Sequence, residues 1–126
     1  MATWIVMLFT NMLIPAILIG FGSLFKNSTP VSINALFGYR TRRSTKNQET
    51  WEFANKLWGK MAWKWGIWTL IDTIAAMIAV FPASDDVIAN VGMIVMFLQL
   101  GVILLTIPVV ENALKKEFDE NGIRRR

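Results

Sequence analysis

The thirteen Lys and Arg residues of this chain occupy only two of the four segments that flank its three long apolar stretches. The apolar stretches cover about 4–25, 65–81 and 87–110. The connector between the first two carries eight of these cations and the C-terminal tail carries the other five, whereas the N-terminus and the short link at 82–86 carry none. Because cytoplasmic flanks of membrane spans are enriched in Lys and Arg, this alternation predicts three spans, with the N-terminus outside the cell and the connector and C-terminus in the cytoplasm.

The composition also favours a membrane protein. Hydrophobic residues make up 54% of the 126 residues, and the mean hydropathy is positive. A helix of about 20 apolar residues crosses a hydrocarbon layer of roughly 30 Å, which is close to the length of each stretch. We therefore predict an all-α, multi-pass protein of the plasma membrane, with 1–126 forming a single membrane domain.

The charge and the missing residue types exclude several classes of function. The formal net charge is +4, but the cations flank the spans, so we expect anionic lipid headgroups and no nucleic acid as partners. The chain has no Cys and no His, which removes thiol chemistry, imidazole acid–base chemistry and the usual zinc ligands. We expect no enzymatic activity, no cofactor and no metal.

The second half of the connector has the pattern of an amphipathic helix. Small, aromatic and apolar residues recur at spacings of three or four, namely Trp51, Ala54, Trp58, Met61, Ala62 and Trp65. Lysines recur every fourth residue on another face, namely Lys56, Lys60 and Lys64. This pattern predicts an interfacial helix over about 46–62 on the cytoplasmic membrane surface, with its tryptophans at headgroup depth.

Local signals suggest where this interfacial helix begins and ends. Thr45 is followed three residues later by Gln48, a spacing that allows a capping box at the helix start. Glycines at 59 and 66 are expected to bend the chain from the interfacial helix into the second span.

Three candidate functional residues lie within the apolar stretches, and we expect them at a similar depth. Asn11, Asp72 and Gln99 would form one polar layer, with Asp72 bonded to Asn11 or Gln99, because an unpaired carboxyl in the bilayer is costly. One interpretation is a proton- or ligand-sensing site. The other is polar contact between helices, next to a close helix contact through Ala75 and Ala79.

The connector carries a longer motif. It reads Asn34-Ala-Leu-Phe-Gly38-Tyr39-Arg40-Thr41, then Ser44, then Trp51-Glu-Phe-Ala-Asn55. This arrangement resembles the signature of the SdpI family of small bacterial membrane proteins, approximately N-x-x-x-G-[YIF]-R-T followed by W-x-x-A-N. Two features depart from the family pattern: the stretch after Thr41 is more basic than usual, and larger members have additional spans.

The resemblance implies an immunity protein of the bacterial plasma membrane that protects against a secreted toxic peptide. It also implies that a member can signal the presence of toxin by holding a cytoplasmic repressor at the membrane. Transferred by position, the family's signature residues are Asn34, Gly38, Tyr39, Arg40, Thr41, Ser44, Trp51 and Asn55.

Physical roles can be proposed for some of these residues. The guanidinium of Arg40 can bind a carboxylate in bidentate fashion, and we expect it to dock on Glu49 or Glu52 with Trp51 packed beneath. The alternative is a purely structural clamp that holds the connector at the membrane surface. Other cations of the connector are interpreted as lipid-headgroup contacts, namely Arg42, Arg43, Lys46, Lys56 and Lys60.

A second class of function stays open. Three spans with one intramembrane carboxylate, Asp72, could form a small proton-coupled transporter or channel subunit that acts as a homo-oligomer. An enzyme acting on lipid or peptidoglycan precursors is disfavoured, because the cytoplasmic acids show no spacing typical of paired acid–base or metal chemistry.

Overall fold

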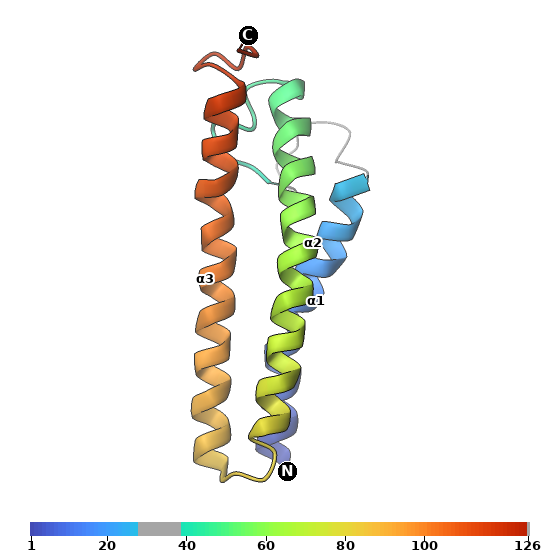
Figure 1. Ribbon diagram of the computed structural model, residues 1–126, viewed down its shortest axis with the longest axis vertical. Helices are drawn as coiled ribbons and strands as arrows, with labels where there is room; N and C mark the ends of the chain where they lie inside the picture. Colours follow the sequence, from blue (N-terminus) through green and yellow to red (C-terminus); the bar gives the residue numbers. More distant parts are fainter. Residues whose placement is uncertain (28–38, 126) are drawn as a thin grey trace.

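The computed structural model describes residues 1–27 and 39–125, and this part of the chain folds into three long helices (Figure 1). They are α1 (Ala2–Asn27), α2 (Gln48–Ala79) and α3 (Asp85–Glu117). α2 runs antiparallel to the other two, and a short turn at 80–84 joins it to α3. The predicted all-α class is therefore confirmed for the described residues.

Two of the helices are long and apolar enough to cross a membrane, namely α1 over Ala2–Lys26 and α3 over Asp85–Glu117. α2 is long enough but less apolar than these two helices, because its first half carries lysines and Asp72 interrupts its apolar second half. Large apolar side chains cover the exterior of α1 and α3, among them Phe9, Leu13, Ile17, Phe97, Leu98 and Leu104. An apolar exterior of this kind suits hydrocarbon rather than water.

The interfacial helix predicted over about 46–62 does not form as a separate element. α2 continues without a break from Gln48 to Ala79, through both glycines at which a bend was expected. The reason is close packing against α1. A Cβ at Gly59 would lie 2.5 Å from the backbone nitrogen of Lys26, and one at Gly66 would lie 2.9 Å from that of Ile19. These glycines allow two helices to approach closely and do not act as hinges.

α2 also begins at a different cap from the predicted one. The expected pair of Thr45 and Gln48 is wrong, and the capping box is formed by Asn47 and Thr50. Asn47 Oδ1 accepts a hydrogen bond from the Thr50 backbone N–H (2.8 Å), while Thr50 Oγ1 accepts one from the Asn47 N–H (3.1 Å). Both groups satisfy backbone donors that a helix start leaves without partners.

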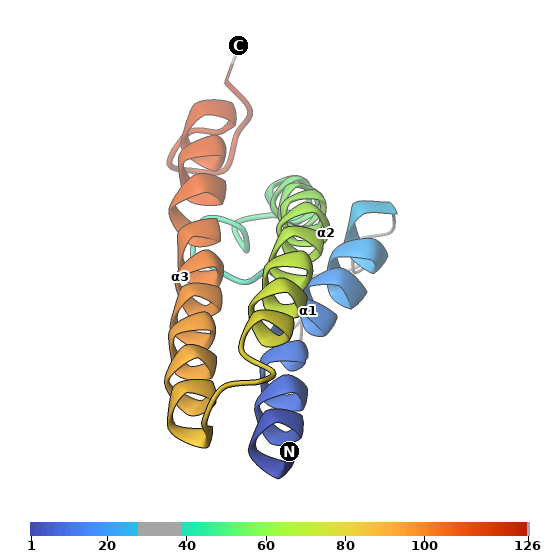
Figure 2. The same cartoon turned by 60° about the horizontal axis from the view of Figure 1, so that its bottom comes forward.

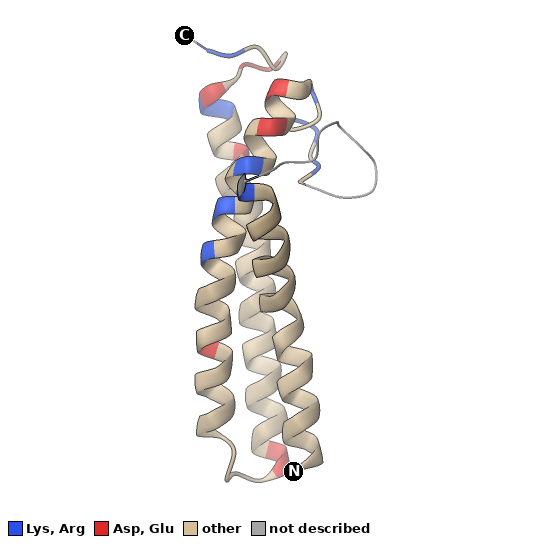
Figure 3. Cartoon of the chain, turned by 90° about the vertical axis from the view of Figure 1, so that its right-hand side faces the viewer, with Lys and Arg blue, Asp and Glu red and all other residues tan. Residues whose placement is uncertain are grey.

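The three helices are not evenly packed. α1 lies against α2, whereas α1 and α3 diverge toward the end of the bundle that holds the start of α2 (Figures 1 and 2). The described Lys and Arg residues gather toward this same end, and Asp85 and Asp86 lie at the opposite one (Figure 3). We call these the cationic end and the turn end.

Candidate functional site

Asn55 on α2 holds the start of the described connector. Its Oδ1 accepts a hydrogen bond from the Tyr39 backbone N–H (2.6 Å), and its Nδ2 donates to the Tyr39 carbonyl (3.3 Å). Nδ2 also donates to the carbonyl of Trp51, one helical turn earlier (3.0 Å). Asn55 and Trp51 are fully buried, and hydrogen bonds in such a setting are strong because water does not compete. Two signature positions, Asn34 and Gly38, lie outside the described residues.

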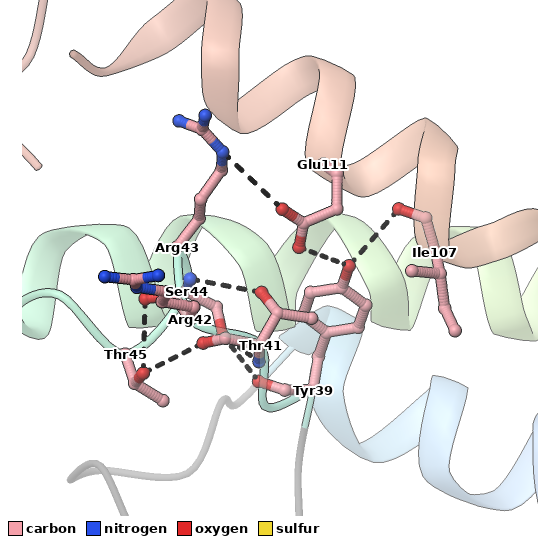
Figure 4. Close-up of polar contacts among 8 residues, drawn as sticks. All are labelled: Tyr39, Thr41, Arg42, Arg43, Ser44, Thr45, Ile107 and Glu111. Atoms are coloured by element: carbon pink, nitrogen blue, oxygen red, sulfur yellow. Dashed lines mark hydrogen bonds and ion pairs between the residues drawn. The ribbon is translucent and has the colours of Figure 1, made fainter. Parts of the chain in front are cut away.

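Thr41 and Ser44 fold the connector into a tight turn (Figure 4). The Thr41 N–H donates to Ser44 Oγ (2.7 Å), and the Ser44 N–H donates to Thr41 Oγ1 (3.2 Å). Thr45 Oγ1 adds a bond to the Thr41 carbonyl (2.8 Å). Short hydroxyl side chains often bind nearby backbone in this reciprocal way. The signature Thr and Ser therefore shape the connector.

The Tyr39 side chain joins this turn to α3. Its hydroxyl donates to Glu111 Oε1 (2.9 Å) and lies 3.3 Å from the Ile107 carbonyl oxygen (Figure 4). Burial raises the pKa of Tyr39 well above its usual range, and the neighbouring Glu111 carboxylate raises it further. The hydroxyl therefore stays protonated and keeps its role as a donor. The other Glu111 oxygen forms an ion pair with Arg43 Nε (3.8 Å).

A small hydrophobic core lies beneath these contacts. It is made of buried side chains from the connector, α2, α3 and the residue after α3, namely Tyr39, Ala54, Val110, Leu114 and Phe118. Phe53 packs edge-on against Phe118, with ring centroids 5.4 Å apart. The cationic end of the bundle thus has a core of its own, to which the signature residue Tyr39 belongs.

Arg40 does not take the predicted position. Glu49 instead binds Arg124 (2.6 Å), and Glu52 accepts a bond from Gln48 (3.2 Å). Arg40 is exposed, and no hydrogen bond or ion pair joins its side chain to another residue in 1–27 or 39–125. Tyr39, not Arg40, binds a carboxylate, that of Glu111. Because the Tyr39 ring is buried, the side chain of Arg40 lies on the outside.

A cavity of about 390 Å³ lies beside Arg40, where α1 and α3 diverge. All three helices and the connector line it, through Phe21, Phe25, Tyr39, Arg40, Thr41, Trp58, Ile103, Thr106 and Ile107. Its walls are mostly apolar, and Arg40 is the charged member of the set. Sequence reasoning missed this cavity because residues from four separate segments form it.

The C-terminal tail folds back on the start of α2, which the sequence reasoning also missed. Asn47 Nδ2 donates to the Gly122 carbonyl (2.7 Å), and Arg124 pairs with both Glu49 and Glu117. Gly122 has a φ of +81°, a backbone conformation that favours glycine. The Asn121-Gly122 pair in a polar tail was an available signal for this turn.

The predicted polar layer forms, but Thr73 takes the place of Asp72 in it. Asn11 and Gln99 are buried and in contact, since Gln99 Nε2 donates to the Asn11 carbonyl (2.9 Å). The third member is Thr73, whose Oγ1 accepts from the same Nε2 (2.7 Å). Asp72, predicted to bond here, is instead exposed on the outside of α2, and so are Ala75 and Ala79. Neighbouring positions on a helix point in directions about 100° apart, so inward Thr73 places Asp72 outward.

Three of the remaining predicted cations, Arg42, Arg43 and Lys46, line a polar hollow together with Glu120 and Asn121. Arg42, Lys46, Lys56 and Lys60 are exposed, as headgroup contacts would require, and Arg43 is held by Glu111. Within residues 1–27 and 39–125, no group of three or more Asp or Glu side chains could hold a metal ion.

These features define a helical membrane protein with a hydrogen-bonded connector between its first two helices. The family model described as the SdpI/YfhL protein family matches residues 31–110, and the chain belongs to this family. A curated relative, the uncharacterized protein YfhL of Bacillus subtilis (strain 168), is 51% identical over 35 residues. That match covers 28% of this chain and 32% of the relative, about a third of its length. No solved structure matches the chain.

Proposed function

We propose that this protein is a bacterial plasma-membrane immunity protein that protects its host against a secreted toxic peptide and can signal the peptide's presence to a cytoplasmic partner such as a repressor. Membership of the SdpI/YfhL family supports this proposal. So does the position of five described signature residues, which hydrogen bonds join into one connected set, namely Tyr39, Thr41, Ser44, Trp51 and Asn55.

The proposed topology has three spans, with the N-terminus outside and the connector in the cytoplasm. α1 and α3 are long and apolar enough to span, and the apolar part of α2 lies between the cationic end and the turn at 80–84. The collection of Lys and Arg at one end supports a cytoplasmic cationic end, since these residues are enriched on that side of membranes. The toxic peptide would then meet the turn end from outside.

The observation that carries the signalling part of the proposal is the double attachment of Tyr39. Its backbone is bound by Asn55 of α2, while its hydroxyl binds Glu111 of α3. A shift of α2 relative to α3 therefore has to change the contacts of the connector. Coupling between distant sites requires a packed element with two arrangements, and this connector is a candidate for that element.

Survival of a sensitive bacterium under challenge with secreted toxic peptides tests the proposal. Cells expressing the protein should survive, and Asn55→Ala should abolish protection, because it removes both bonds that attach the Tyr39 backbone to α2. Lys56→Ala is the matched control, since it changes the adjacent exposed residue of the same helix and should leave protection intact. Membrane fractions probed for the protein confirm equal amounts of each variant. Equal protection by Asn55→Ala and the control would refute the assigned role of the signature.

One observation favours a second function, a proton-coupled transporter or channel subunit that acts as a homo-oligomer. Asp72 is exposed on the outside of α2, where contact with hydrocarbon would cost about 2.5–3.5 kcal/mol on insertion scales. Contact with another copy would remove that cost. Proteoliposomes loaded with a pH-sensitive dye should then show proton flux that Asp72→Asn abolishes, and vesicles that remain tight to protons contradict this function.

A further inference from the structure

The cavity between α1 and α3 at the cationic end combines apolar walls with a cation that has no partner in the described chain. Phe21, Phe25, Trp58 and Ile103 provide aromatic and branched walls, and Arg40 lines the same cavity. An apolar space with a single charge beside it suits an amphiphile with a negative head. We call this space the α1–α3 crevice.

The apolar surface extends beyond the crevice along α1. A second hollow of about 380 Å³ follows this helix and is lined by Leu13, Ala16, Ile17, Gly20, Phe21 and Leu24. Phe21 lines both hollows, so the two adjoin. From residue 24 to residue 13 the helix rises about 16 Å, which is close to half the thickness of a bilayer's hydrocarbon core. This is the length that one acyl chain of a single leaflet requires.

Arg40 is held ready for an anion. The backbone on either side of it is fixed, by Asn55 at Tyr39 and by Ser44 at Thr41. The nearby carboxylate of Glu111 is already bound by Tyr39 and Arg43. A guanidinium binds phosphate oxygens well, and fixing its backbone in advance reduces the entropy lost on binding.

The polar groups of the crevice argue for a lipid rather than a peptide. Tyr39 donates its hydroxyl proton to Glu111, and Thr106 Oγ1 donates to the Ile103 carbonyl (2.6 Å). Thr41 Oγ1 accepts the Ser44 N–H. A peptide backbone would bring polar groups of its own that need partners, whereas an acyl chain needs none.

We propose that the α1–α3 crevice binds one anionic phospholipid, with its phosphate on the Arg40 guanidinium and one acyl chain between Phe21 and Ile103. The phospholipid would connect α1 and α3 where the two helices diverge. This inference goes beyond the immunity function and does not depend on it, because a lipid site can exist whatever the protein protects against.

Native mass spectrometry of the full-length protein in detergent tests the charged part of this site. Phosphatidylglycerol and phosphatidylcholine with identical acyl chains serve as probes. Both lipids carry a phosphate, but the choline cation of phosphatidylcholine is repelled by Arg40. We therefore expect phosphatidylglycerol to bind about tenfold more tightly, and Arg40→Gln to abolish that preference. Lys116→Gln is the matched control, because it removes one positive charge from the same end of the bundle at an exposed residue that does not line the crevice. Equal binding of both lipids to the wild type, or equal losses in the two variants, would overturn the proposal.

The apolar part is tested by filling the crevice. Ile103→Trp should weaken binding of both lipids several-fold, while Leu104→Trp, at an outward residue 64% exposed, should leave it unchanged. Equal binding in the two variants would overturn the proposal. Soluble glycerol phosphate is a third probe, and we expect it to bind far more weakly than phosphatidylglycerol. If it competes equally well, the acyl chain makes no contribution and the proposed phospholipid site is wrong.

Discussion

The two ends of the helical bundle are held together in different ways. At the cationic end, directional hydrogen bonds from Asn55, Thr50 and Asn47 tie the connector and the tail to α2, above a hydrophobic core. The turn end relies on close helix contacts, with the Trp4 indole donating to the Met77 carbonyl (2.7 Å) and its ring packed against Phe81. The cationic end should therefore be sensitive to loss of a polar group as well as to added volume at Gly59, and the turn end mainly to a change of volume.

This difference follows from the surroundings of the two ends. Irregular backbone carries amide groups that need partners, and the connector finds them in buried side chains. Regular helices satisfy their own backbone, so their association in a membrane depends on packing and a few polar contacts.

The largest expected effect is that of Asn55→Ala on stability. The substitution leaves the Tyr39 N–H without a partner in a buried setting, and it leaves the Tyr39 carbonyl with Ser44 Oγ alone. We expect a loss of about 3 kcal/mol in the free energy of unfolding, since each buried unsatisfied group costs about 1–3 kcal/mol. Denaturant unfolding of the detergent-solubilised protein measures this loss, and Lys56→Ala should change it by less than about 0.5 kcal/mol. A loss no larger than that of the control would contradict the role assigned to Asn55.

At the turn end, Gly92→Ala should cost about 1–2 kcal/mol through overpacking. A Cβ at Gly92 would overlap the methyl end of Met7 and lie 3.2 Å from Asn11 Nδ2. Gly101→Ala in the same helix is the control, because a Cβ there meets nothing within 4 Å. The control should be neutral or slightly stabilising, since alanine is the better helix former. Similar unfolding midpoints for the two variants would count against close packing at Gly92.

Substitutions at the polar layer should change stability less, and the change should be larger at Thr73 than at Asp72. Thr73→Val removes one of the two acceptors of Gln99 Nε2 and should cost about 0.6 kcal/mol, the average for such bonds in membranes. Asp72→Asn should change stability less, because Asp72 points away from the layer. Thermal unfolding of both variants in the same detergent gives the comparison, and the reverse order would place Asp72 inside the bundle.

The last prediction concerns the titration of Tyr39, the only tyrosine of the chain. This titration changes the free energy of unfolding at alkaline pH and has the smallest effect at neutral pH. Its pKa in the folded protein is raised above the unfolded value of about 10. The resulting contribution to stability is complete below about pH 10 and is lost as the pH rises above that value through the folded pKa. Tyrosinate absorbance should therefore appear later in the folded than in the unfolded protein. The Tyr39→Phe variant should lose less stability at alkaline pH than the wild type, because it has no hydroxyl to ionise. If the Tyr39 hydroxyl of the folded protein titrates near pH 10, its buried position is refuted.

Much of the helical architecture could be predicted from the chain itself. The long apolar stretches indicated the helices, and the G-Y-R-T and W-x-x-A-N motifs led to the family. The same reasoning misplaced neighbouring residues. It chose Arg40 where Tyr39 docks and Asp72 where Thr73 is buried, because residue type alone does not say which of two adjacent side chains faces a neighbouring element.

The glycines of α2 also show that residue type alone does not determine a residue's structural role. A glycine can mark a bend or a close contact, and Gly59 and Gly66 serve as contacts because α1 lies against them. The order of apolar and basic segments determined the helical class of this protein and its charge asymmetry, because both depend on composition along the chain. Only the tertiary structure decided which side chains meet at the connector and how the α1–α3 crevice opens, because those contacts join segments that are far apart in sequence.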